Sequence, residues 1–112
     1  MLNFSNTLLK HQVKQVRVSQ ELKRYVVDIV NATRSADDVQ LGASPRASIA
    51  LMKVAQALAL FDGYEFVAPE HIQELAVPAI AHRLVMEPRS HFAGKTASSV
   101  VQEILQSVPV PT

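Results

Sequence analysis

Apolar residues recur along this chain at intervals of three and four, the spacing of one face of an α-helix. The clearest stripe begins after Ser19, a residue that favours the start of a helix because its hydroxyl accepts from orphan backbone amides. This stripe contains Leu22, Val26, Ile29, Val30 and Thr33. Arg34 follows at its end, where the negative end of the helix dipole favours a cation. The pattern predicts a helix from about residue 20 to 34.

The next helix is predicted from Pro45 to about Phe61. Its apolar residues fall on more than one side, which is typical of a helix at the centre of a bundle. Several alanines along it allow close packing against neighbours. Gly63 follows and is a natural left-handed residue for ending a helix.

Weaker patterns complete the prediction. Residues 6–16 form a possible first helix, Pro69 begins a fourth behind a poor cap at Ala68, and Thr96 or Ser98 begins a last helix. Residues 16–18 and 64–67 are predicted to be extended, whereas 35–40 and 90–95 are predicted to be loops. The sequence therefore predicts an all-α fold, a small bundle of about five helices with at most a minor β-pair.

The start of the helix at Pro45 carries the most distinctive local chemistry. Gly42 permits unusual backbone conformations, Ser44 suits the cap position and Pro45 fits the first helical position. Arg46 then places a cation at the positive end of the helix dipole, where it is disfavoured. The residues alone leave two interpretations open. In the first, Arg46 pairs with a surface carboxylate or stays in water. In the second, it contacts an anion such as a phosphate.

Composition excludes several classes of function. The chain has 112 residues, a hydrophobic content of 48%, no cysteine and a formal net charge of +1. We expect one domain without disulfides or thiolate metal sites, in a reducing compartment such as the cytoplasm. No signal peptide and no apolar run long enough to span a membrane are visible. The weak net charge, and a third helix without Arg, Asn and Gln on one face, argue against nucleic-acid binding.

No catalytic or metal site is expected from the sequence. The chain lacks the glycine-rich loop ending in Lys-Ser/Thr that cradles a triphosphate. Its four histidines lack the spacing of metal ligands, since His71 and His82 would lie roughly 16 Å apart on a helix. These are surface histidines in the simplest interpretation. An enzymatic activity of this chain alone is therefore not expected.

Several stretches together resemble the C-terminal lid domain of MoxR-type AAA+ ATPases. The most specific is Gly42-Ala43-Ser44-Pro45-Arg46-Ala47, and the match extends from about residue 16 to the C-terminus. Supporting stretches occur in the family order: Ala32-Thr33-Arg34, Ala59-Leu60-Phe61-Asp62-Gly63, Phe66-Val67-Ala68-Pro69-Glu70, Ala81-His82-Arg83-Leu84 and Val108-Pro109-Val110-Pro111. The resemblance assigns 16–112 to a helical lid and 1–15 to a linker or first lid helix. His71 and Ala68 depart from the usual acidic residue and the usual Ser or Thr.

The resemblance implies a divided ATPase mechanism. Arg46 matches the sensor-2 arginine, which reaches the phosphates of a nucleotide held by a separate core domain, with Ser44 and Pro45 beside it and Arg34 as support. ATP with Mg²⁺ is expected in the full-length protein, and no cofactor is expected for the isolated domain.

The partners implied by the resemblance are the core domain of the same chain and neighbouring subunits of a ring, hexameric by family. Von Willebrand factor A-domain proteins are a further implied partner, in a chaperone-like role. The alternative is a stand-alone helical module that binds a partner protein without nucleotide.

Overall fold

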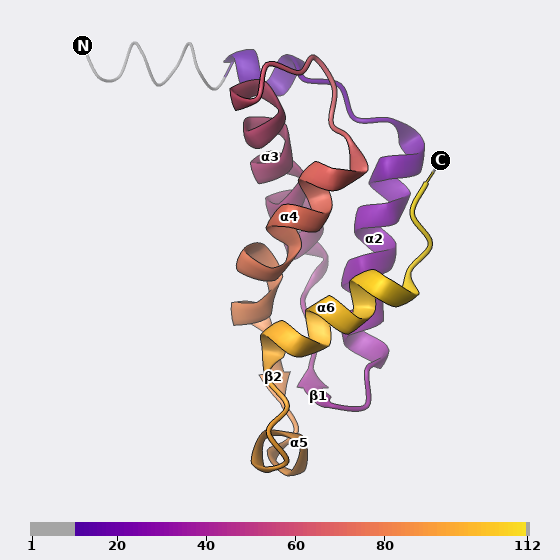
Figure 1. Ribbon diagram of the computed structural model, residues 1–112, viewed down its shortest axis with the longest axis vertical. Helices are drawn as coiled ribbons and strands as arrows, with labels where there is room; N and C mark the ends of the chain where they lie inside the picture. The colour runs from indigo at the N-terminus through magenta and orange to yellow at the C-terminus, as the bar shows by residue number, and fades with distance from the viewer. Residues whose placement is uncertain (1–10, 112) are drawn as a thin grey trace, which may run out of the picture.

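The fold is a small helical bundle with one short β-pair, as the sequence predicts (Figure 1). A computed structural model describes residues 11–111. Its helices are α2 (Gln20–Ser35), α3 (Pro45–Phe61), α4 (Pro69–Ile80), α5 (Pro88–Phe92) and α6 (Ala97–Ser107), with a 3-10 turn, η1 (Ala81–Arg83), after α4. Of the expected first helix, residues 11–15 are helical, whereas 6–10 lie outside the described part of the chain.

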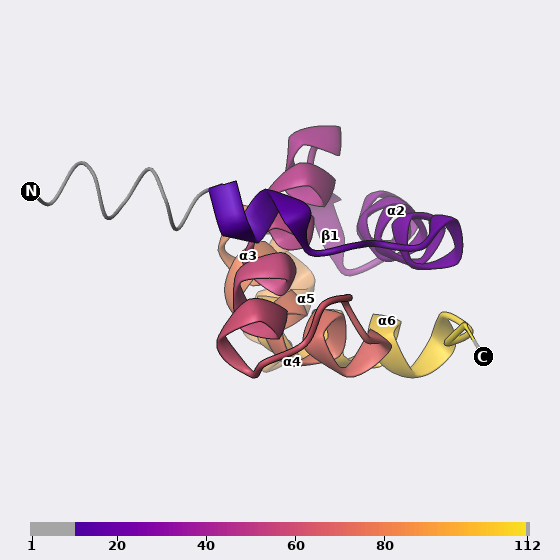
Figure 2. The ribbon, with the colours of Figure 1, turned by 90° about the horizontal axis from the view of Figure 1, so that it is seen from above.

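Helix α3 lies at the centre of the bundle. It packs against both α4 and α2, while α6 lies across α2 and α4 (Figures 1 and 2). Side chains from these helices form one hydrophobic core, in which the largest fully buried residues are Tyr25, Val26, Ile29, Val30, Thr33, Leu51, Ile72, Ile80 and Val101. The stripe predicted on α2 is thus the face that this helix turns to the core.

The β-pair joins two segments that are distant in sequence. Strand β1 (Val39–Leu41) pairs antiparallel with β2 (Val85–Met86), with Leu41 opposite Val85. The Glu87 amide extends the pairing by donating to the Asp38 carbonyl over 2.9 Å. This is the minor β-pair that the sequence allowed. Residues 39 and 40, which were expected to end the loop over 35–40, belong to β1.

Helix α5 corrects the expectation of a loop over 90–95. Pro88 occupies the first helical position, where no amide hydrogen is needed. The Ser90 hydroxyl donates to Asp38 Oδ1 over 2.6 Å and fastens this turn to the β1 side of the molecule. Gly94, with a φ of 90°, then ends the turn. A polar stretch with one glycine gave no apolar periodicity, so the pattern did not reveal this short helix.

Four helix ends follow the predicted chemistry, among them the poor cap at Ala68. The Ser19 hydroxyl accepts from the Leu22 amide, Gly63 has a φ of 84°, and Thr96 rather than Ser98 caps α6. Ala68 has no side-chain oxygen and cannot cap α4 through its side chain. His71 makes one of the hydrogen bonds at this helix start instead. The backbone amide of Ala68 donates to His71 Nδ1 over 2.9 Å.

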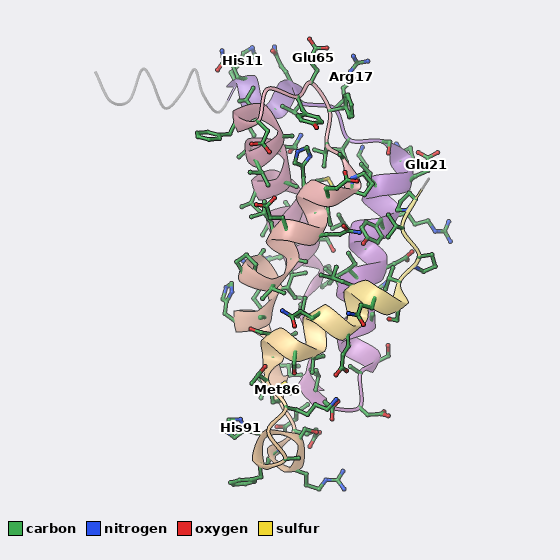
Figure 3. All side chains as sticks on the ribbon, in the orientation of Figure 1. His11, Arg17, Glu21, Glu65, Met86 and His91 are labelled. Atoms are coloured by element: carbon green, nitrogen blue, oxygen red, sulfur yellow. The ribbon has the colours of Figure 1, made fainter. Side chains whose placement is uncertain are left out.

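A short parallel bridge connects the two segments predicted to be extended. The Arg17 amide donates to the Glu65 carbonyl over 3.0 Å, and the Val67 amide donates to the Arg17 carbonyl over 2.8 Å. In Figure 3 Arg17 and Glu65 lie at the same end of the molecule as His11, whereas Met86 and His91 lie at the opposite end. No helix in the described part of the chain is long and apolar enough to cross a membrane.

Candidate functional site at the start of α3

The candidate site is the junction at which α2 ends and α3 begins. The Thr33 hydroxyl, fully buried in α2, donates to the Val30 carbonyl over 2.6 Å and accepts from the Ala43 amide over 3.0 Å. A single hydroxyl therefore satisfies a buried amide of the loop that leads into α3. Ala43 in that loop and Ala47 in the first turn of α3 are both buried and pack against the core.

Gly42 is needed here for close packing rather than for an unusual backbone angle. Its φ is not positive, so the sequence-based argument about conformational freedom does not apply. A Cβ atom at this position would lie 2.7 Å from Arg34 Cα and 2.8 Å from Arg34 Cγ. The loop therefore rests directly on the last turn of α2, and only glycine fits without displacing one of them.

Ser44 is the N-cap of α3 by backbone geometry, with a ψ of 166°, but its hydroxyl makes no capping bond. The prediction that the hydroxyl accepts from a first-turn amide is therefore wrong. The Ala47 amide instead donates to the Ser44 carbonyl over 2.9 Å, which closes the first turn through the backbone. Pro45 occupies the first helical position as predicted. The Ser44 side chain is left exposed beside the helix start.

Arg46 is exposed at the second position of α3. The first turn of α3 contains no acidic residue, and no ion pair or hydrogen bond of the Arg46 side chain occurs within residues 11–111. Of the two interpretations left open by the sequence, the pairing with a surface carboxylate is not observed in this part of the structure. The guanidinium is available to an external anion.

Arg34 reaches the same junction from α2. It is also exposed, and its stem lies against Gly42. The structure thus brings Gly42, Ser44, Pro45 and Arg46 to one junction and adds a second cation beside them. A helix N-terminus with an unpaired arginine can bind a phosphate by charge and hydrogen bonds. No group of three metal-binding side chains occurs among the described residues.

The prediction of a surface histidine is wrong for His71, which is buried, and sequence reasoning missed its role. Its side chain is 6% exposed, its Nδ1 accepts from the Ala68 amide, and its Nε2 lies 3.7 Å from Asp62 Oδ2. The Tyr64 ring packs edge-on against it, with centroids 4.9 Å apart. His71 therefore joins the end of α3 to the start of α4. The sequence did contain a signal for this role. Ala68 is an unsuitable cap, and His71 follows three residues later with a side chain that can accept from the cap amide, which is half of a capping box.

Comparison with known proteins agrees with this architecture. Residues 31–104 match the model of the AAA lid domain. The chain is 46% identical to the YeaC protein of Bacillus subtilis over 92% of its own length, and 33% identical to the chaperone MoxR1 of Mycobacterium tuberculosis over 84%. It superposes with a TM-score of 0.86 and 30% identity on the crystal structure of a candidate ATPase from Cytophaga hutchinsonii, over 91% of this chain.

These relatives are considerably longer than the present chain. The chain covers 32% of YeaC, 27% of MoxR1 and 34% of the Cytophaga protein. It therefore spans about a third of the proteins that it matches, and the lid resemblance accounts for most of its own length. The chain belongs to the AAA lid domain family, as a lid of the MoxR type.

Proposed function

We propose that the chain is the C-terminal lid of a MoxR-type AAA+ ATPase and that Arg46 contacts the phosphates of nucleotide bound by the core domain. The observation that carries this proposal is the exposed guanidinium of Arg46 at the start of α3, which has no ion-pair partner among residues 11–111. The stand-alone interaction module is less well supported, because the relatives are about three times as long as the chain.

The placement of Arg46 favours an anionic partner on physical grounds. A cation at a helix N-terminus opposes the helix dipole by roughly 0.3–1 kcal/mol. A phosphate at the same position reverses that sign and adds a charge-assisted hydrogen bond of about 1.5–3 kcal/mol. The Ser44 hydroxyl, which makes no capping bond, can donate a further hydrogen bond, and Pro45 fixes the backbone between Ser44 and Arg46. Arg34 supports the site from the last turn of α2 by adding positive charge.

The lid couples nucleotide state to movement because Arg46 is fixed to the fold. The Ala43 to Thr33 hydrogen bond and the contact of Gly42 with Arg34 tie the start of α3 to the end of α2. A contact that differs between ATP, ADP and empty states therefore shifts the lid as a body relative to the core. In a ring assembly, hexameric in our proposal, the shift passes to the neighbouring subunit and serves a chaperone-like role, with von Willebrand factor A-domain proteins as partners.

The core domain supplies the catalytic chemistry in this proposal. It holds ATP and Mg²⁺, whereas the lid contributes one arginine and its mobility. The lid alone then hydrolyses no ATP and binds it with a dissociation constant of about 1 mM or weaker, near 4 kcal/mol.

The test is ATP turnover by the full-length protein. Arg46→Ala lowers turnover by about tenfold or more, which corresponds to about 1.4 kcal/mol of lost contact. Arg34→Ala gives a smaller loss, because it only supports the site. Arg24→Ala, an exposed arginine on α2, is the matched control and leaves turnover unchanged. Unchanged turnover in Arg46→Ala would show that this arginine does not act on the nucleotide.

A further inference from the structure

His71 is the one buried histidine of the four in the chain. Its ring lies between the end of α3 and the start of α4, whereas His11, His82 and His91 are exposed. Imidazole is the side chain that ordinarily changes its charge between about pH 5 and pH 8. The protonation state of this ring therefore bears on how the joint between the two helices is held.

The hydrogen bond from Ala68 determines which nitrogen of the ring carries the proton. The Ala68 backbone amide donates to His71 Nδ1 over 2.9 Å. A backbone amide can only donate, so Nδ1 presents its lone pair and the neutral ring holds its proton on Nε2. Nε2 faces Asp62, at 3.7 Å from Oδ2, which is too long for a hydrogen bond. The contact at the start of α4 thus requires the neutral ring.

The ring is placed between one neutral partner and one anionic partner. Asp62 is the C-cap of α3, and its side chain is 45% exposed. Tyr64 packs edge-on against the ring from the connection between the helices. The carboxylates that follow on this connection and on α4 are exposed, namely Glu65, Glu70 and Glu74. In the described part of the chain, no ion pair or hydrogen bond joins the ring to α2 or α6.

A proton on Nδ1 is incompatible with this arrangement. Both nitrogens of the charged ring are donors, so Nδ1 would meet the Ala68 amide donor to donor. The same charge strengthens the attraction of the ring to the Asp62 carboxylate, which lies within ion-pair range. Protonation therefore removes the contact with α4 and favours the contact with the end of α3.

We propose that His71 is a proton-operated switch in the joint between α3 and α4. The neutral ring binds the amide of Ala68, and the protonated ring releases that amide and pairs with Asp62. Ala68 has no capping oxygen, so release leaves the start of α4 without this side-chain bond. The next amide along, that of Val67, donates to the Arg17 carbonyl over 2.8 Å, so the loosening reaches the parallel bridge.

The switch needs neither nucleotide nor a second domain, so NMR of the 112-residue chain tests it. At about pH 8 the nitrogen shifts of His71 should place its proton on Nε2. Between about pH 8 and about pH 5, the protection of the Ala68 amide against hydrogen exchange should fall about tenfold or more. The protection of the Val67 amide should fall with the same midpoint as the His71 ring.

Two variants show whether this response belongs to His71. His71→Gln keeps a side chain that accepts from the cap amide but cannot titrate, so Ala68 should stay protected over the whole range. His91→Gln removes an exposed histidine instead and should retain the parent response. A loss of Ala68 protection in His71→Gln that matches the parent would assign the response to another group and overturn the proposal.

Two results in the parent chain would also overturn the proposal. One is a His71 proton on Nδ1 at about pH 8, because the Ala68 bond would then not exist. The other is Ala68 protection that stays constant down to about pH 5, whether or not the ring takes up a proton in that range.

Discussion

The backbone amide of Ala43 donates to the buried hydroxyl of Thr33 over 3.0 Å, and this bond fixes the loop that presents Arg46. The two residues belong to different sides of the junction between α2 and α3. The hydroxyl also donates to the Val30 carbonyl, so both of its hydrogen-bonding functions are used inside the core. Replacing it with a methyl group leaves a buried amide without a partner.

Thr33→Val should therefore lower the free energy of unfolding by about 1–3 kcal/mol, because valine fills the same space without accepting from Ala43. Urea unfolding of the 112-residue chain measures the loss. Thr33→Ser is the control, since it keeps the hydroxyl and removes only a methyl group. Hydrogen exchange of the Ala43 amide should accelerate in the valine variant and much less in the serine variant. Equal exchange in both variants would contradict the assigned bond.

Gly42→Ala should destabilise the protein by about 1–3 kcal/mol, because the added Cβ meets the backbone of Arg34 and forces the loop away from α2. ATP turnover of the full-length protein should also fall, since the start of α3 moves with the loop.

Gly63→Ala is the informative comparison for Gly42→Ala. Gly63 has a φ of 84° and no atom within 4 Å of an added Cβ, so alanine there costs about 1–2 kcal/mol through backbone strain alone. Turnover should be preserved in Gly63→Ala. A Gly42→Ala protein with unaltered stability and turnover would show that the junction tolerates a side chain.

Ala68→Ser should raise the free energy of unfolding by about 0.5–2 kcal/mol, because a hydroxyl at the start of α4 supplies the capping oxygen that alanine lacks. Thr96→Ala should lower it by a similar amount, since the Thr96 hydroxyl now accepts from the Ser99 amide over 3.0 Å. Thermal unfolding of the two variants should shift in opposite directions. A shift of both in the same direction would contradict this account of the two helix starts.

Lys95 should make stability depend on alkaline pH. Its hydrogen bond to Glu103, together with the charges of Glu103 and Asp38, raises the pKa of Lys95 above its ordinary value of 10.5. A raised folded-state pKa means that the contribution of the ammonium group is complete below pH 10.5 and is lost as the pH rises through the folded-state value.

Lys95→Gln should accordingly reduce stability at neutral pH but approach the parent chain at high pH. Urea unfolding from about pH 9 to about pH 12 measures the convergence. Because the Lys95 side chain is 40% exposed, salt screens its ion pairs and the difference should also shrink in high salt. Lys23→Gln, an exposed lysine on α2, should show no such convergence. A constant difference across this range would contradict the role of the two carboxylates.

The sequence predicted the helices wherever apolar spacing was long and regular. The stripe from Leu22 to Thr33 became the buried face of α2, and Pro45 began α3 as expected. The short β-pair and α5 depend instead on contacts between distant segments, such as Ser90 with Asp38, which no local pattern contains.

The candidate site was located from local chemistry, but the contacts from α2 that hold it in place were not predicted. Ser44, Pro45 and Arg46 were found because helix starts have a recognisable composition, and the role of Arg46 in nucleotide binding stays a prediction. The need for glycine at position 42 could not be predicted, because it depends on the close approach of Arg34 from another helix. Likewise, Thr33 was assigned to an apolar stripe, and only the fold shows that its hydroxyl serves Ala43.

The parallel bridge at Arg17 anchors the segment that precedes α2. Both backbone groups of Arg17 are bound to the segment between α3 and α4, and Val16 is held by Gln56. A pull applied to the chain before Val16 would act on these three hydrogen bonds before it acts on α2. The segment that leads into α2 is therefore tied to the connection between α3 and α4 before α2 begins.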